Sequence, residues 1–187
     1  MNALGLLEKQ VMQKRAVAGL PRKVEALDRL NSLSLVLNQG LAWVAGGSLL
    51  LMVLVVVGNA ILRVVYAPFP GTTEIVGWLA AVTGAFGLGY TQVNRGYVEL
   101  DALVERFSPG LQKAIKRLML FISMIFFALV AWQITVYGLN VAENGNLSET
   151  MGIPYYPLIF LVSLGFVGLT LAILVDFLKE FNGGATR

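Results

Sequence analysis

The sequence predicts an all-α integral membrane protein, a bundle of four transmembrane helices with a short amphipathic surface helix between the second and third spans. Composition is one reason: of 187 residues, 57% are hydrophobic and 13% are charged, against about 25% charged residues in a typical soluble domain. The placement of the charges is the other. Four runs contain no charged residue, namely Leu30–Leu62, Ile75–Asn94, Leu118–Ala142 and Thr150–Val175. Each run can cross a bilayer, which takes about 20 apolar residues.

The first transmembrane span is expected at residues 37–62, within a four-helix membrane domain over residues 35–181. A cytoplasmic or surface segment at residues 1–34 precedes this domain, and a disordered tail at residues 182–187 follows it. Two prolines and a glycine lie in the turn after Arg63. Proline lacks the backbone donor that a continuing helix needs, so the first span ends there.

The second span, at about residues 75–92, is the shortest and the richest in glycine. Glu74 suits the start of this helix, because the helix dipole favours an acid at its N-terminus. Small residues recur in this span at a spacing of four, at Gly77, Ala81, Ala85 and Gly89. Such a stripe lets another helix backbone approach closely. It therefore predicts a packing surface, either inside the bundle or against a partner protein.

A short surface helix is expected over residues 98–107. Its apolar residues recur at positions i, i+3, i+4 and i+7, as Leu100, Leu103, Val104 and Phe107. Charged residues occupy the other side. This pattern is typical of a helix that lies in the headgroup layer of a membrane.

The third and fourth spans are expected at residues 118–139 and 154–176. Prolines near the start of the fourth span are tolerated in a first helical turn. The hairpin between these spans, Asn140–Met151, contains two acids and no base, and the acids are Glu143 and Glu149.

Few polar side chains lie within the spans. Asn59 and Gln133 are the uncharged ones that we expect inside, where they would hydrogen-bond a neighbouring helix rather than bind a ligand. Arg63 and Glu74 flank one short turn and could form a salt bridge between the first two helices. Such a pair would fix helix register more than it adds stability.

The basic residues indicate the orientation of the chain. Of 14 Lys and Arg residues, 13 fall on one side of the predicted membrane and only Arg63 falls on the other. Cytoplasmic loops carry an excess of Lys and Arg, so both termini are expected in the cytoplasm of a multi-pass inner-membrane protein. The net charge of +3 is thus explained by the excess of Lys and Arg on the cytoplasmic side. No nucleic-acid partner is expected.

Composition also excludes most chemistry. Without histidine or cysteine the chain cannot ligate haem through two histidines, bind a cysteine-ligated iron–sulfur cluster, form a disulfide or build a histidine-based triad. No carboxylate pair or phosphate-binding loop can be assembled, so we expect neither an enzyme nor a metal or cofactor site. Internal repeats and polar groups at the midplane, typical of secondary transporters, are lacking. A polar helix face typical of a channel is also lacking. A partner that performs transport is therefore inferred.

Three motifs carry a resemblance to a known family: Thr73-Glu74 before the second span, Gly152-Ile153-Pro154 before the fourth, and the stretch Arg95–Asp101. The chain resembles the small membrane subunit (DctQ, or Q subunit) of tripartite ATP-independent periplasmic (TRAP) transporters over about Asp28–Phe181. Family members often carry an Arg-Gly-Gly-His-Ile-x-Val-Asp-like stretch, which this chain matches at Arg95, Gly96, Val98 and Asp101. Tyr97 stands where histidine is frequent, and the tryptophan often found before the second span is lacking.

The resemblance implies a scaffold subunit. In this family a large membrane subunit (M) carries the sodium-coupled site and moves it by an elevator-type motion, while a periplasmic substrate-binding protein (P) delivers an organic acid. The outward surface of the Q subunit helps the binding protein dock, which makes Glu143 and Glu149 candidate docking residues. Membrane lipids would contact the surface helix. The alternative is a four-helix membrane adaptor or assembly protein unrelated to transport.

Overall fold

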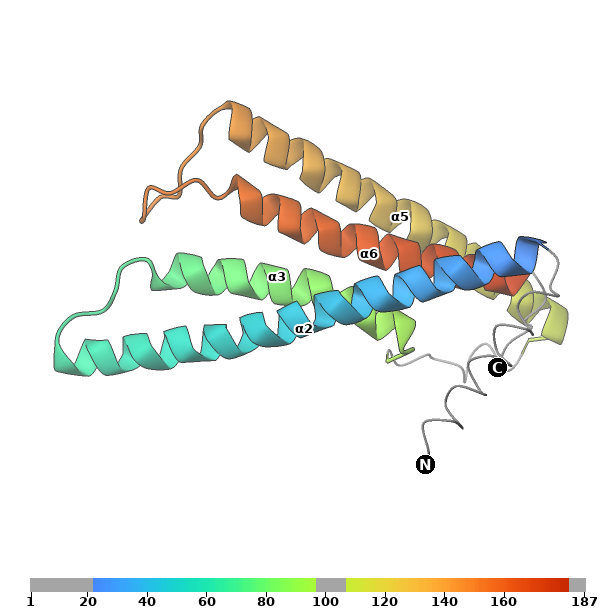
Figure 1. Cartoon of the computed structure of the whole chain (residues 1–187), viewed down its shortest axis with the longest axis horizontal. Coiled ribbons are helices and arrows are strands. Elements are labelled where there is room, and N and C mark those ends of the chain that lie inside the picture. Colours follow the sequence, from blue (N-terminus) through green and yellow to red (C-terminus); the bar gives the residue numbers. More distant parts are fainter. Residues whose placement is uncertain (1–21, 97–106, 182–187) are drawn as a thin grey trace, which may run out of the picture.

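The computed structural model describes residues 22–96 and 107–181. These residues form four α-helices, α2 (Arg22–Val65), α3 (Thr72–Val93), α5 (Pro109–Glu143) and α6 (Tyr156–Phe181), shown in Figure 1. Most of the predicted surface helix at residues 98–107, including Asp101, lies outside the described residues. So do the tail at residues 182–187 and the first 21 residues of the predicted N-terminal segment.

Three of the described helices are long and apolar enough to cross a membrane, over Ala26–Val65, Gly110–Glu143 and Tyr156–Phe181. The all-helical fold and the membrane character predicted from sequence are therefore confirmed. Helix α3, which is rich in glycine and threonine, is not one of these three. Its 22 residues would extend about 33 Å, which is enough for a hydrocarbon core of about 30 Å. That α3 spans the membrane stays a prediction.

Two antiparallel helix pairs, α2–α3 and α5–α6, make up the structure. We call the end with residues 66–71 and 144–155 the loop end, and the opposite end, where α2 begins and α6 ends, the terminal end. Helix α6 packs against α2, α3 and α5, whereas α5 packs chiefly on α6. The pairs lie close together at the terminal end and diverge toward the loop end (Figure 1). The arrangement is therefore open, with α6 at its centre and α5 at one edge.

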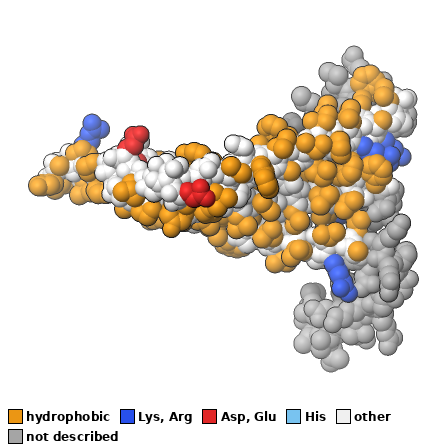
Figure 2. Space-filling view, turned by 90° about the horizontal axis from the view of Figure 1, so that it is seen from above, with side chains coloured by type: hydrophobic (Ala, Val, Ile, Leu, Met, Phe, Trp, Pro, Cys, Tyr) orange, Lys and Arg blue, Asp and Glu red, His pale blue; other side chains and the backbone are white. Residues whose placement is uncertain are grey.

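The core lies between α2, α3 and α6. Small and apolar side chains are buried there: Leu41, Ala45, Val82, Ala85 and Phe86, with Leu169, Ala172 and Ile173 from α6. A side chain at Gly165 would place its Cβ 2.8 Å from the backbone carbon of Ala85. Only glycine permits so close an approach of α6 to α3. Elsewhere hydrophobic side chains cover most of the visible surface of the described helices (Figure 2).

The contact at Gly165 predicts a large cost for added volume. Gly165→Ala should destabilise the protein by about 1–3 kcal/mol, because the new methyl group has no space between α3 and α6. Thermal unfolding in detergent measures the effect. Gly84→Ala on α3 is the control, because a Cβ there meets nothing within 4 Å. Equal melting temperatures for the two variants would contradict the packing described.

Candidate functional site

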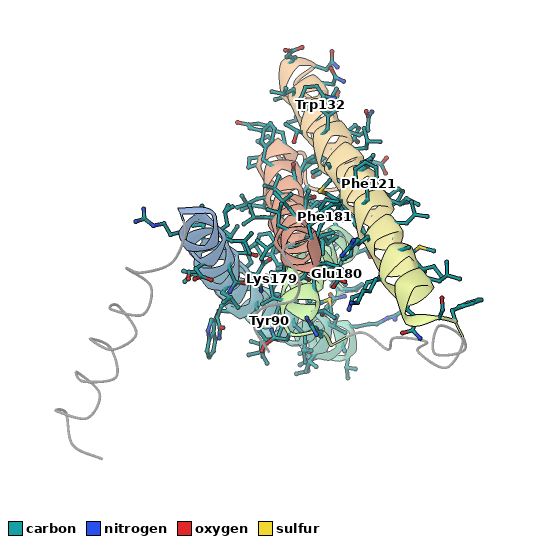
Figure 3. The ribbon with its side chains drawn as sticks, turned by 90° about the vertical axis from the view of Figure 1, so that its right-hand side faces the viewer. Tyr90, Phe121, Trp132, Lys179, Glu180 and Phe181 are labelled. Carbon is teal, nitrogen blue, oxygen red and sulfur yellow. The ribbon has the colours of Figure 1, made fainter. Side chains whose placement is uncertain are left out.

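The end of α6 is the point where polar contacts from all the other described helices meet. Each of α2, α3 and α5 supplies one side chain to the last two turns of α6. The contacts are Asn31 Oδ1 with Lys179 Nζ at 2.7 Å, Gln92 Nε2 with Asp176 Oδ2 at 2.8 Å, and an Arg117 guanidinium nitrogen with the Glu180 carbonyl oxygen at 3.2 Å. Figure 3 shows Lys179, Glu180 and Phe181 at this end, between α2 and α5.

Aromatic rings extend the same contact between α5 and α6. The guanidinium carbon of Arg117 lies 5.1 Å from the centroid of the Phe181 ring, a cation–π geometry. The Phe177 ring is tilted against two others, with its centroid 5.0 Å from that of Phe181 and 5.9 Å from that of Phe121 of α5. The terminal end is therefore fixed both by polar contacts and by ring packing.

A buried asparagine joins α2, α3 and α6 nearer the middle of the helices. Asn38 is fully buried, and its Nδ2 donates to the carbonyl oxygens of Ser34 at 2.9 Å and of Gly168 at 3.1 Å. Its Oδ1 has no hydrogen-bond partner and points at Gly89 of α3, where any Cβ would overlap it. Sequence analysis selected Asn59 and Gln133 and missed Asn38. The available signal was Ser34 and Asn38 at a spacing of four, on one face of α2.

The structure places the four residues of the α3 stripe in two different environments. Ala85 and Gly89 are buried, Ala85 against Gly165 of α6 and Gly89 against Asn38 of α2. Gly77 and Ala81 are exposed, because α6 has diverged from α3 at that level. Half of the stripe thus packs inside the protein, and the other half is uncovered.

Glu74 links the start of α3 to the hairpin between α5 and α6. Its Oε1 accepts a hydrogen bond from the backbone amide of Thr150 at 2.7 Å, and Gly71 packs against Met151. The Thr150 amide lowers the pKa of Glu74 most; hydrogen bonds from Ser148, Thr150 and Met151 add to this and desolvation opposes it. This contact takes the place of the expected salt bridge with Arg63, whose side chain is exposed.

The family-motif residues Arg95 and Gly96 end helix α3. Gly96 N donates to Thr91 O at 2.9 Å and Arg95 N to Gln92 O at 3.2 Å, the two bonds of a Schellman motif. Arg95 has a φ of 50°, a left-handed conformation that costs a residue with a side chain about 1–2 kcal/mol. The positive charge of Arg95 is favourable at this position, because the C-terminal end of a helix carries the negative end of the dipole. Both residues are exposed.

The remaining sequence-predicted residues lie at the surface. Glu143 is the last residue of α5, Glu149 lies in the hairpin, and both are exposed at the loop end. Asn59 accepts the Phe69 amide at 2.7 Å and so holds the α2–α3 turn rather than another helix. The prediction that Gln133 lies inside is wrong, because its side chain is exposed on α5. α6 covers only the opposite side of that helix.

Among the described residues, no three acidic side chains lie close enough to hold a metal ion. Ser163 is buried but bonded, to Thr135 Oγ1 at 2.6 Å and to the Ala131 carbonyl at 3.1 Å. The geometry therefore defines a helical membrane protein whose buried polar groups hold its own helices together.

Comparison with known proteins assigns the family. The family model for tripartite ATP-independent periplasmic transporters, DctQ component, matches residues 52–183, which is more than half of the chain. The chain belongs to the DctQ family, as its resemblance predicted, and is a TRAP transporter component that associates with the DctM and DctP components. No curated protein and no solved structure matches it.

The Glu74 contact predicts a response to acid. Because the pKa of Glu74 is lowered in the folded protein, its stabilisation is complete above the ordinary value of 4.5 and is lost as the pH falls below it. Hydrogen exchange of residues 148–152 measures the contact. Glu74→Gln should speed exchange at pH 7 and remove the additional acid-induced loss of protection that the unmodified chain shows.

Glu149→Gln is the matched control, since it removes an exposed carboxylate from the same hairpin. Its exchange at residues 148–152 should follow the unmodified chain. If the two variants exchange alike at pH 7, Glu74 does not hold the hairpin.

Proposed function

We propose that this chain is the small scaffold subunit of a TRAP-type secondary transporter. It would support a large elevator subunit during sodium-coupled uptake of an organic acid that a periplasmic binding protein delivers. The family match over residues 52–183 carries this proposal. The alternative of a membrane adaptor unrelated to transport has no comparable support.

The distribution of polar groups supports a role without its own transport route. Charged residues lie at the helix ends, and none occurs in α2 between Leu30 and Leu62 or in α6 before Asp176. The buried Ser163 and the Asn38 amide nitrogen are engaged in hydrogen bonds between helices. A solute or ion crossing this subunit would find no free charged partner along these stretches. Transport must then occur in the large subunit.

Contacts at both ends of the molecule support a rigid role. At the terminal end, α6 is tied to the three other described helices. At the loop end, Glu74 joins the α2–α3 pair to the hairpin of the α5–α6 pair. An elevator needs a support that keeps its position in the bilayer while the moving part slides. Two helix pairs tied at both ends meet this need.

The proposed orientation places the terminal end on the cytoplasmic side of a bacterial inner membrane. Lys113 and Lys116 are exposed at that end, whereas Arg63 is at the loop end. This distribution follows the positive-inside rule. Glu74 and Gln92 lie at the two ends of the apolar part of α3, which supports α3 as the second span at residues 75–92. The surface helix at residues 98–107 would then contact lipid headgroups on the cytoplasmic side.

The loop end would face the periplasmic binding protein. Glu143 and Glu149 are exposed there, and their charges can attract basic side chains of a docking partner. The substrate class proposed is an organic acid. Its recognition would lie in the other two components, so its identity is not encoded in this chain.

Reconstitution tests the proposal. Liposomes are loaded with this chain alone, with the large subunit and binding protein alone, or with all three, and are given a sodium gradient with radiolabelled C4-dicarboxylate, sialic acid and 2-keto acids. Uptake should need all three proteins, because the chain supports the moving subunit but binds no substrate. Uptake by this chain alone would overturn the scaffold assignment, as would full uptake without it.

A further inference from the structure

Helix α5 is uncovered over most of its length. It has 35 residues, and among those whose burial is described only Ala131, Gly138 and Val141 are buried. These three lie on one side of the helix, where α6 covers it. Figure 3 shows α6 between α5 and α2, so α5 stands at the edge of the arrangement.

The side of α5 opposite α6 carries a row of exposed apolar side chains. Ile122, Phe126 and Leu129 follow one another at helical spacing and are 52%, 58% and 61% exposed. Gln133 continues the row four residues after Leu129 and is also exposed. We call Ile122, Phe126, Leu129 and Gln133 the uncovered face of α5. Trp132, which is 70% exposed, borders this face.

Gln133 lies inside the predicted third span rather than at its end. That span covers residues 118–139, and Gln133 lies about 7 Å along the helix from its midpoint. The amide has two donor hydrogens and an acceptor oxygen, yet it forms no hydrogen bond within the described residues. Lipid chains offer it none, so this exposure is unfavourable in a bilayer.

Trp132 gives a second indication at the same depth. Tryptophan usually lies at the membrane–water interface, where its ring is partly hydrated. Trp132 instead lies about 5 Å from the midpoint of the predicted span at residues 118–139, next to Gln133. Its indole N–H has no partner within the described residues either. Gln133 on the uncovered face and Trp132, which also lines a pocket shared with α6, thus both carry unused donors at a depth where lipid cannot pair them.

Helix α2 provides a contrast. Its exposed amide, Gln39, lies ten residues from Arg29 and one turn from Trp43, which is 79% exposed. This position is about 16 Å from the midpoint of the predicted span at residues 37–62, and Trp43 is about 10 Å from that midpoint. A glutamine so close to the end of a span can reach water or headgroups. Only the amide on α5 therefore requires a protein partner.

We propose that the uncovered face of α5, centred on Leu129 and Gln133, binds a membrane-spanning helix of the large subunit. The amide of Gln133 hydrogen-bonds a polar side chain or an unpaired backbone carbonyl of that helix. Interhelical hydrogen bonds of this kind join transmembrane helices where hydrophobicity provides no driving force. The proposal rests on the proposed function, which supplies the large subunit as the partner.

The first test compares two variants of the assembled transporter in mild detergent. Gln133→Leu should weaken binding of the large subunit by about tenfold, the upper part of the range for one interhelical hydrogen bond. The isolated chain should melt no lower than before, since leucine is favourable on a lipid-facing surface. Gln39→Leu is the matched control and should leave binding unchanged. Equal binding by both variants would overturn the proposal.

The second test uses a photoreactive benzoylphenylalanine in place of Leu129 in the full complex. It should cross-link to the large subunit, whereas the same group in place of Leu54, which is 68% exposed on α2, should label lipid. Cross-linking from position 129 to lipid or to a second copy of this chain would overturn the proposal. If the large subunit co-purifies but cross-links only from position 54, this inference fails and the proposed function stands. If no large subunit co-purifies with the unmodified chain, both fail.

Discussion

The close approach of α6 to α2 and α3 is the constraint on which the rest of the structure depends. Gly165 has no side chain, so the backbone of Ala85 can pack directly against it. Gly89 leaves room for the buried Asn38 side chain, whose amide nitrogen donates a hydrogen bond to the Gly168 carbonyl. In a bilayer such packing replaces the hydrophobic driving force that holds soluble bundles together. The contact sets α6 at the centre. From there the polar contacts of Asp176 and Lys179 secure the terminal end.

The same constraint explains the functional surfaces. Helices α2 and α3 cover one side of α6, so α5 packs only on the other side of α6. Most of α5 is therefore left uncovered. The buried polar groups are used to join helices, which leaves a subunit suited to support a partner rather than to carry a solute. Glu74 then joins the two helix pairs at the loop end despite their divergence.

The sequence predicts the elements better than their contacts. Charge-free runs locate the three helices that are long and apolar enough to cross a membrane, because a bilayer tolerates few charges. Asn38 was missed because its partner Gly168 is 130 residues away and no local pattern connects them. The spacing of the stripe from Gly77 to Gly89 predicts one continuous surface. In the structure α6 diverges from α3, so only the half of the stripe with Ala85 and Gly89 is covered. Gln133 was placed inside because α5 is apolar all round, and periodicity then cannot show which side a neighbour covers.

The central claim, that this subunit stays rigid while its partner moves, can be measured directly as a distance. The chain contains no cysteine, so Thr73→Cys and Asn140→Cys, both at exposed positions on different helix pairs, are the only sites in this subunit that accept spin labels. Pulsed electron paramagnetic resonance on the complete transporter in lipid would compare this distance with and without sodium, substrate and binding protein. The account predicts one unchanged distance distribution. A shift of several ångströms, about the scale of one helical turn, would contradict it.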